Sequence, residues 1–242
     1  MSVRFQELDC RTTALGELVL RRRWDPVFDR EVHEIKLNDD FLMSSLFTVA
    51  EVELGRLALA ELAPGQWDVV VGGLGLGFTA LSVLANADVR RLVVVDALAE
   101  VIEWHEQGLI PAGAELTADP RCGFVRGDFF EMARSGANFG PAATPEGRWH
   151  AIVVDIDHSP RHLLHPDNAD LYQPAGLRRL AERLHPGGVF ALWSNDPPDD
   201  VFTAALTDTF AEVRAEIVRF DNPLQKRDAT ATVYLATTAP TG

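Results

Sequence analysis

The chain has 242 residues, of which 47% are hydrophobic and 24% charged, and this ordinary composition excludes a disordered or fibrous protein. Acidic residues outnumber basic ones by 36 to 22, and the resulting formal charge of -14 argues against nucleic acid and anionic membranes as partners. No apolar run is long enough to span a membrane, the N-terminus lacks a signal-peptide pattern, and the two cysteines suggest no disulfide framework. We therefore expect a cytoplasmic protein.

The first quarter of the chain predicts a small β-rich unit followed by a helix. Polar and apolar residues partly alternate in three segments, which predicts strands at residues 3–8, 16–22 and 30–37. Apolar residues then recur at helical spacing over 45–62, and Pro64-Gly65 ends this predicted helix. We therefore predict an N-terminal unit with a linking helix over 1–63 and a second, nucleoside-binding catalytic domain over 64–242.

From Trp67 onward, short apolar strands alternate with helices. The strands are predicted at 67–71, 91–95, 123–126, 150–155 and 189–193, and the helices near 78–86, 98–106, 129–134, 174–184 and 201–210. Continuous β-branched runs are typical of parallel strands that are covered on both faces. Residues 216–220 and 231–236 predict a final antiparallel pair, and 135–148 an exposed loop. The predicted fold class is α/β, with a doubly wound, mostly parallel, seven-stranded sheet.

The glycine-rich segment Gly72–Gly77 follows the first strand of this predicted sheet and precedes a helix. In an open α/β sheet, ligands bind beyond the carboxyl ends of the strands, so this segment lies where a ligand is expected. Glycines let the backbone approach a ligand closely, and a helix N-terminus favours anionic or polar groups. A tight turn between strand and helix would use the same residues.

Acidic residues follow three further strands. Asp96 lies about 20 residues beyond the glycine segment, where a carboxylate can accept both hydroxyls of a ribose. Asp128 can accept a hydrogen bond from an adenine amino group. Asp155 directly ends a buried strand, which is costly unless the carboxylate is solvated or bound. A nicotinamide site has no evident need for Asp128, so the pattern favours an adenosyl ligand.

These segments resemble the spermidine synthase (polyamine aminopropyltransferase) family in order and spacing from about residue 67 to 193. The segments are VVVGGLGLGFTA, RLVVVDALAEVIEW, DPRCGFVRGDFF, WHAIVVDIDHSP and LYQPAGLRRLAERLHPGGVFALW, with a weaker likeness in GELVL and VHEI. The resemblance implies a class I methyltransferase-like Rossmann fold and decarboxylated S-adenosylmethionine as the donor. It also implies a small-molecule amine acceptor and a homodimer built partly through the N-terminal unit.

The resemblance assigns roles to individual residues. It implies that Asp96 holds the ribose, that Gly127 and Asp128 hold the adenine, and that Asp155 deprotonates and orients the attacking amine. The implied nucleoside-binding set is Gly72, Gly73, Gly75, Gly77, Asp96, Ala97, Gly127, Asp128 and Asp155. Catalytic candidates are Asp155, Asp157, His158 and Tyr172, and candidate substrate contacts are His33, Glu34, Asp157 and Asp170.

The chain departs from the family pattern mainly on the amine side. Where the family's G-G-G-D-G loop has an Asp that binds the aminopropyl amine, this chain has Gly75. The family's D-S-S-D-P is D-I-D-H-S-P here, and the Tyr of its Y-H-E-M stretch is Val32. Aminopropyl transfer to an amine is therefore the leading hypothesis. The alternatives are a methyltransferase or aminocarboxypropyl transferase that uses intact S-adenosylmethionine, and a non-catalytic nucleoside- or polyamine-binding homologue.

Three histidines follow the fourth parallel strand, at positions 158, 162 and 165. A metal site would need a fixed arrangement of these rings, but two prolines interrupt the segment and no cysteine joins it, so we expect no metal. His158 lies beside Asp155 in sequence and can act as a proton shuttle, because imidazole titrates near neutral pH. The alternative is a loop histidine without a role.

Overall fold

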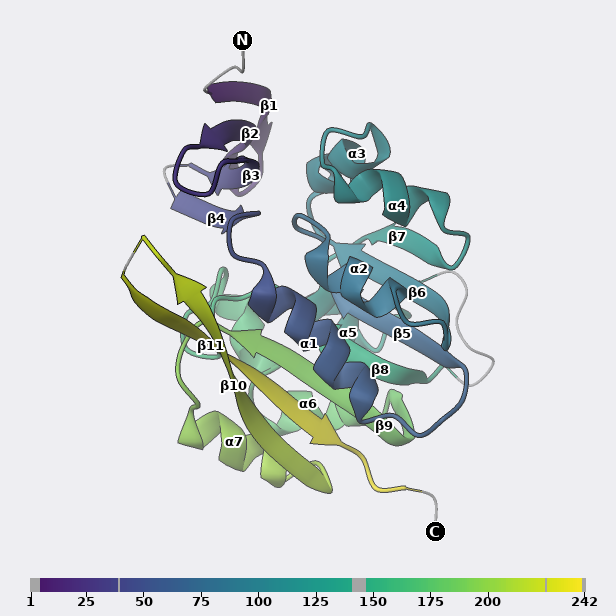
Figure 1. The fold of residues 1–242 in the computed structure, drawn as a ribbon. Helices are drawn as coiled ribbons and strands as arrows, with labels where there is room; N and C mark the ends of the chain where they lie inside the picture. Colours follow the sequence, from purple (N-terminus) through teal and green to yellow (C-terminus); the bar gives the residue numbers. More distant parts are fainter. Residues whose placement is uncertain (1–4, 39, 141–146, 225, 241–242) are drawn as a thin grey trace.

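Residues 5–38, 40–140, 147–224 and 226–240 are described by the structure, a computed structural model (Figure 1). Its N-terminal part is a four-stranded antiparallel sheet with the strand order β1-β2-β3-β4. The strands are β1 (Phe5–Thr13), β2 (Gly16–Asp25), β3 (Arg30–Leu37) and β4 (Asp40–Ser44). The three predicted strands are thus present, and β4 is an addition. Residues 3 and 4 of the first predicted strand lie outside the described residues.

The larger sheet has seven strands in the order β10-β11-β9-β8-β5-β6-β7. They are β5 (Trp67–Gly72), β6 (Val89–Asp96), β7 (Cys122–Arg126), β8 (Trp149–Val154), β9 (Leu184–Ser194), β10 (Glu212–Asn222) and β11 (Arg227–Thr237). Strands β5 to β9 are mutually parallel, whereas β11 runs antiparallel to both β9 and β10. The predicted fold class and the final antiparallel pair are confirmed. The strand order switches direction at β5, which has β6 on one side and β8 on the other.

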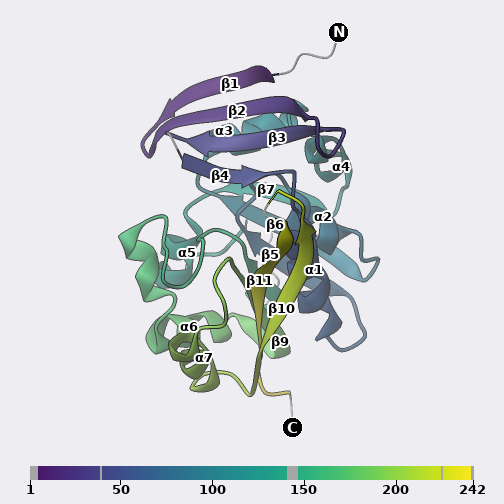
Figure 2. The same ribbon diagram turned by 60° about the vertical axis from the view of Figure 1, so that its left-hand side comes forward.

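Helices cover both faces of this sheet (Figure 2). Helices α1 (Val49–Ala60), α2 (Phe78–Leu84), α3 (Ala99–Glu106) and α4 (Ala112–Ala118) lie on one face. On the other lie α5 (Phe129–Ser135), α6 (Pro174–Ala181) and α7 (Asp200–Thr207), with a short 3-10 helix, η1 (Pro166–Asp170). A hydrophobic core lies on each face of the sheet, and alternate residues of β5 pack into the two cores. Val69 and Val71 pack into one core and Val70 into the other. This two-sided burial explains the continuous valine runs.

Helix α1 begins later than the predicted 45–62 helix. Ser45 still pairs with β3, since its N–H donates to the carbonyl oxygen of His33 at 2.9 Å. Its hydroxyl also accepts from the His33 N–H at 2.9 Å. These two bonds hold Ser45 in the continuation of β4 and keep it out of the helix.

The N-terminal sheet lies beside α3, as both ribbon views show. The indole N–H of Trp104, which is fully buried, donates to a carboxylate oxygen of Asp9 at 2.7 Å. Leu18 and Leu20 of β2 belong to the same hydrophobic cluster as the buried side chains of α1 and α3. The predicted division between 1–63 and 64–242 stays a prediction, since this cluster includes residues from both sides of it.

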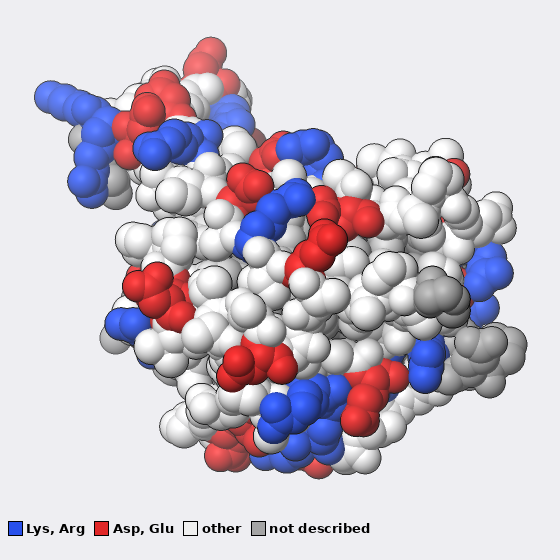
Figure 3. Space-filling view, turned by 90° about the horizontal axis from the view of Figure 1, so that it is seen from below, with Lys and Arg blue, Asp and Glu red and all other residues white. Residues whose placement is uncertain are grey.

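Surface charge is mixed on the face shown in Figure 3, where a small group of Lys and Arg side chains is flanked by Asp and Glu. A nucleic-acid-binding surface requires a continuous basic patch or stripe, which this face does not show. Within the described ranges, no helix is both long enough and apolar enough to cross a membrane.

Candidate active site

The loop between β5 and α2 forms the first wall of the site. Gly73 and Gly75 have φ angles of 95° and 48°, in the left-handed region that favours glycine. A Cβ atom on Gly73 would lie 2.1 Å from the carbonyl oxygen of Asp155. On Gly75 it would lie 2.6 Å from the sulfur of Met43, in β4. The Gly73 position therefore requires glycine for conformation and for space, whereas the Gly75 position requires it for conformation, because the flexible end of Met43 can move aside.

Asp96 ends β6 and binds the glycine loop. One carboxylate oxygen accepts from the N–H of Leu74 at 2.9 Å, and the other accepts from the N–H of Leu98 at 2.8 Å. Burial raises the pKa of Asp96, although these backbone hydrogen bonds act in the opposite direction. Ala97 follows Asp96 and is exposed at the same edge. A carboxylate has further lone pairs beyond these two bonds, so the predicted ribose contact is sterically reasonable and stays a prediction.

Asp128 lies beyond the end of β7 and caps helix α5. Its carboxylate oxygen Oδ1 accepts from the N–H groups of Phe130 and Glu131 at 2.9 and 3.1 Å. The N–H of Gly127 donates to the carbonyl oxygen of Asp96 at 2.9 Å, which brings the two strand ends together. An acidic N-cap is favourable for any helix, so this arrangement explains Asp128 structurally. Its predicted contact with adenine stays a prediction.

Asp155 directly follows β8 at the switch in strand order. Its N–H donates to the carbonyl oxygen of Gly72 at 2.8 Å, which ties it to the end of β5. The hydroxyl of Thr79, in the first turn of α2, donates to Asp155 Oδ2 at 2.6 Å. Burial raises the pKa of Asp155 to about 6. This carboxylate is still mostly ionised at neutral pH and holds a proton more readily than an ordinary aspartate.

Glu51, in the first turn of α1, is a site residue that the sequence analysis does not identify. Burial and the nearby negative charge of Asp155 raise the pKa of Glu51 to about 8. An acidic residue in the first turn of a helix is common, because it favours the helix dipole. Glu51 lies three, four and seven residues before Leu54, Gly55 and Ala58, so it shares a helix face with these buried residues. This spacing is the feature of the sequence from which Glu51 could have been identified. An acid on the buried stripe of a helix indicates a special environment.

Asp157, in the loop that follows β8, and Tyr172 contact each other in a buried cluster. Asp157 accepts hydrogen bonds from the Tyr172 hydroxyl at 2.7 Å, the Asn168 side-chain amide at 2.9 Å and the Leu164 N–H at 2.6 Å. Burial raises the pKa of Asp157, and these three donors oppose that shift. The cluster fixes the loop next to Asp155. The predicted catalytic roles of Asp157 and Tyr172 stay predictions.

The three histidines of this loop occupy different environments. His158 is exposed, and its carbonyl oxygen accepts from the N–H of Asn195 at 2.8 Å. His162 Nδ1 contacts Asp196 at 2.8 Å, and the Ser159 hydroxyl donates to the same carboxylate oxygen at 2.6 Å. His165 accepts from an N–H of η1. In the part of the chain that the structure describes, no group of three or more His, Cys, Asp or Glu side chains could hold a metal ion.

The remaining predicted substrate contacts have structural partners of their own. Glu34 is buried and receives hydrogen bonds from Arg21 and Arg23 at 2.7 and 2.8 Å within the N-terminal sheet. His33, the preceding residue of β3, is also buried, and burial lowers the pKa of its imidazole. Asp170 forms an ion pair with Arg179. Their predicted contacts with an acceptor stay predictions.

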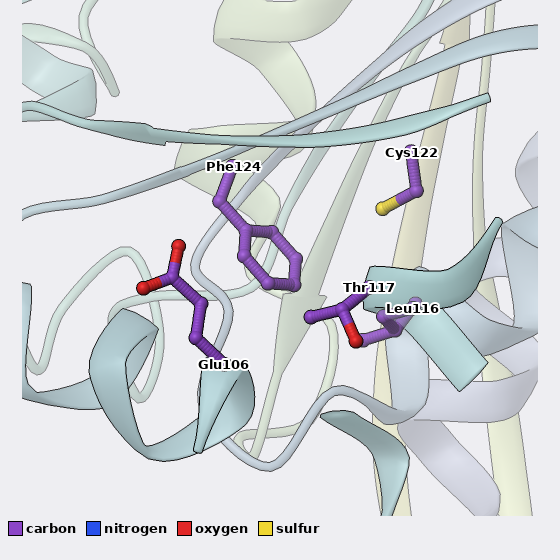
Figure 4. A pocket seen from close by; sticks show the side chains of 5 residues that line it. All are labelled: Glu106, Leu116, Thr117, Cys122 and Phe124. Carbon is purple, nitrogen blue, oxygen red and sulfur yellow. The ribbon is translucent and has the colours of Figure 1, made fainter. Parts of the chain in front are cut away.

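A separate cavity of about 270 Å³ lies between α3, α4 and β7 (Figure 4). Its lining residues are Glu106, Leu116, Thr117, Cys122 and Phe124. Cys122 is the first residue of β7, whereas the site described above lies at the carboxyl ends of the strands. Burial raises the pKa of the Cys122 thiol to about 12, so this thiol stays protonated and unreactive at neutral pH.

Replacing Gly73 with alanine tests the close contact between the glycine loop and Asp155. We expect the free energy of unfolding to fall by about 2–4 kcal/mol, because the new Cβ atom overlaps a backbone oxygen and φ is unfavourable. The matched control is Gly108→Ala, where φ is 70° and no described atom lies within 4 Å. Urea unfolding of both variants measures the difference, and equal losses would contradict the clash.

No family model matches the chain. Polyamine aminopropyltransferase 2 of Pseudomonas aeruginosa is 28% identical over 158 residues. The match covers 61% of this chain and 41% of that protein, so the chain corresponds to less than half the length of this relative.

Solved structures extend the likeness to almost the whole chain. A spermidine synthase in complex with the transition-state analogue AdoDATO has a TM-score of 0.72 and 16% identity, covering 98% of this chain and 75% of that one. The spermidine synthase from Thermotoga maritima has a TM-score of 0.71 and 14% identity, and the match covers 98% of this chain and 73% of that one. The strand order and the site at the carboxyl edge define a Rossmann-like protein of the class I methyltransferase type. Within that class, the chain has the fold of the spermidine synthases, as its sequence motifs predict.

Proposed function

We propose that the chain is an aminopropyltransferase, which moves the aminopropyl group of decarboxylated S-adenosylmethionine to an amine acceptor. One observation carries the proposal: Asp155 directly follows β8, its backbone contacts the glycine loop, and its partly buried carboxylate lies near a second carboxylate, Glu51. The names of the similar proteins, a polyamine aminopropyltransferase and two spermidine synthases, support the same activity.

The carboxyl edge of the sheet has the chemistry that an adenosyl donor needs. Asp96 offers carboxylate lone pairs to ribose hydroxyls, and Asp128 offers an exposed carboxylate to an adenine amino group. Gly73 and Gly75 of the glycine loop present backbone without a Cβ atom at the same edge. When bound, the donor supplies a carbon that its sulfonium group makes electrophilic.

Asp155 prepares the acceptor for attack. A primary amine is protonated at neutral pH and has no free lone pair, so a proton must leave its nitrogen first. Asp155 accepts this proton, and its pKa of about 6 keeps it ionised while bringing it closer to the pKa of an amine. The nitrogen lone pair then forms the new C–N bond. The C–S bond breaks, and its electron pair leaves with sulfur as a neutral thioether.

The proposal includes a cytoplasmic homodimer that pairs through the N-terminal sheet. Large apolar side chains of this sheet are exposed, among them Phe5 at 53% and Phe41 at 55%. Exposed aromatic residues are enriched at protein interfaces, where burial stabilises them. Light scattering of the purified chain measures this directly, and a mass of one chain would contradict it.

Turnover of defined substrates tests the activity. We expect the purified chain, incubated with decarboxylated S-adenosylmethionine and a panel of mono-, di- and triamines, to release methylthioadenosine and an aminopropylated amine. Mass spectrometry detects both products. Products formed only from intact S-adenosylmethionine would overturn the proposal in favour of methyl or aminocarboxypropyl transfer.

A further inference from the structure

Helices α1 and α2 approach each other unusually closely beside Asp155. A Cβ atom on Gly55 would lie 2.8 Å from the hydroxyl of Ser82, so only glycine fits at this crossing. The same hydroxyl donates to the carbonyl oxygen of Val52 at 2.6 Å. The Thr79 hydroxyl lies 3.4 Å from the carbonyl oxygen of Glu51 while it donates to Asp155. These contacts fix the first turn of α1, and Glu51 with it, near Asp155.

The elements packed around α1 leave Glu51 without a cation among the described residues. Helix α2 has no charged residue. At this end of β8 the charged group is Asp155, whereas His150 lies near the opposite end. On the side of β10 and β11, Arg214 pairs with Glu61, which follows the far end of α1. The negative charge that acts on Glu51 is that of Asp155, and together with burial it disfavours ionisation of Glu51.

The glycine loop does not supply the carboxylate that the spermidine synthase motif has at this position. Gly75 occupies it, and Met43 of β4 fills the space into which a side chain would extend. The peptide carbonyl of Gly75 is held from the other side by His105, whose Nε2 lies 2.9 Å away. An anionic group for the donor's ammonium must therefore come from another element, and Glu51 lies on the element next to this loop.

We infer that Glu51 is a specificity-determining residue, which together with Asp155 favours the decarboxylated donor over intact S-adenosylmethionine. The inference rests on the proposed function and concerns the same site. The propyl end of the decarboxylated donor carries only an ammonium group, which the two carboxylates attract. Intact S-adenosylmethionine carries a carboxylate on the adjacent carbon, which they repel.

Nucleoside binding to the wild type, Glu51→Gln and Glu53→Gln tests this role. Glu53 lies on the same helix and pairs with Arg56 at the surface, so its variant is the matched control. Calorimetry measures the affinity for decarboxylated S-adenosylmethionine, intact S-adenosylmethionine and the uncharged methylthioadenosine. At pH 9, where Glu51 is mostly ionised, we expect Glu51→Gln to reduce the preference for the decarboxylated donor by about tenfold, on the scale of one buried charge contact, with no change for methylthioadenosine. Glu53→Gln should match the wild type.

A pH series separates an electrostatic role from a structural one. The preference of the wild type for decarboxylated over intact S-adenosylmethionine should increase between pH 6 and pH 9, because Glu51 ionises around its pKa of about 8. The Glu51→Gln variant should lack this increase. Folding raises this pKa, so ionisation of Glu51 destabilises the native state above its ordinary pKa. The melting temperature of Glu51→Gln at pH 8 should therefore equal or exceed that of the wild type.

The outcomes separate this inference from the proposed function. An unchanged preference in a folded Glu51→Gln variant overturns the inference alone, because the proposed transfer does not require it. Absence of turnover with every amine overturns the proposed function, whereas the binding preference remains measurable. A wild-type chain that binds none of the three nucleosides overturns both.

Discussion

Asp155→Asn is expected to lower kcat by about 10²–10⁴-fold, the range that a positioned general base contributes. Asparagine keeps the size of the side chain and can still accept from the Thr79 hydroxyl, but it cannot take a proton from the ammonium of the acceptor. Methylthioadenosine should therefore bind the variant as it binds the wild type. Asp208→Asn is the matched control, because Asp208 is exposed beyond the end of α7. Product formation at the same background level in the wild type and in Asp155→Asn would favour the non-catalytic homologue.

The pH dependence of kcat/KM in the wild type follows from the ionisation of Asp155. Asp155 acts as a base only when ionised, so kcat/KM should fall as the pH drops through about 6. The hydrogen bond from Thr79 lowers the pKa of Asp155 and partly offsets the effect of burial. Thr79→Val should therefore move this acidic limb to higher pH. A limb that stays in place in the variant would show that another group controls the rate.

The parallel sheet could be predicted because each of its strands is covered on both faces. This environment selects continuous runs such as Trp67–Gly72, whose buried valines alternate between two cores. Helix α4 is not predicted, since it is short and contains Gly113, a poor helix former. A Cβ atom at Gly113 would lie 2.3 Å from the carbonyl oxygen of His105. The packing of α4 on α3 therefore requires a residue that local propensity disfavours.

The location of Asp96, Asp128 and Asp155 at one edge of the sheet could be predicted, because topology alone brings the carboxyl ends of parallel strands together. Glu51 could not be located in this way, since its position depends on the close crossing of α1 over α2 at Gly55. The strand-end position favours Asp155 over Asp157 in the sequence, and the structure adds the different surroundings of the two acids. Both follow the same strand, but Asp155 lies at the glycine loop and Asp157 is enclosed by three donors.

Asp157→Asn is expected to reduce the free energy of unfolding by about 2–4 kcal/mol, because an amide group replaces one of two oxygens that receive buried donors. At least one donor from Leu164, Asn168 or Tyr172 is then left without an acceptor, and the loop after β8 loses its anchor. Tyr172→Phe removes a single donor and should cost about 1 kcal/mol, without leaving a buried donor unsatisfied.

Urea unfolding of both variants, combined with turnover, separates anchoring from catalysis. If Asp157 acts by holding the loop beside Asp155, the loss of turnover in both variants should follow the loss of stability and should be largest for Asp157→Asn. The acidic limb near pH 6 should remain, since it belongs to Asp155. Wild-type stability together with a large loss of turnover in Asp157→Asn would instead mean that Asp157 contacts the acceptor directly. In that case its buried hydrogen bonds would have to open during the reaction, because they now occupy both of its carboxylate oxygens.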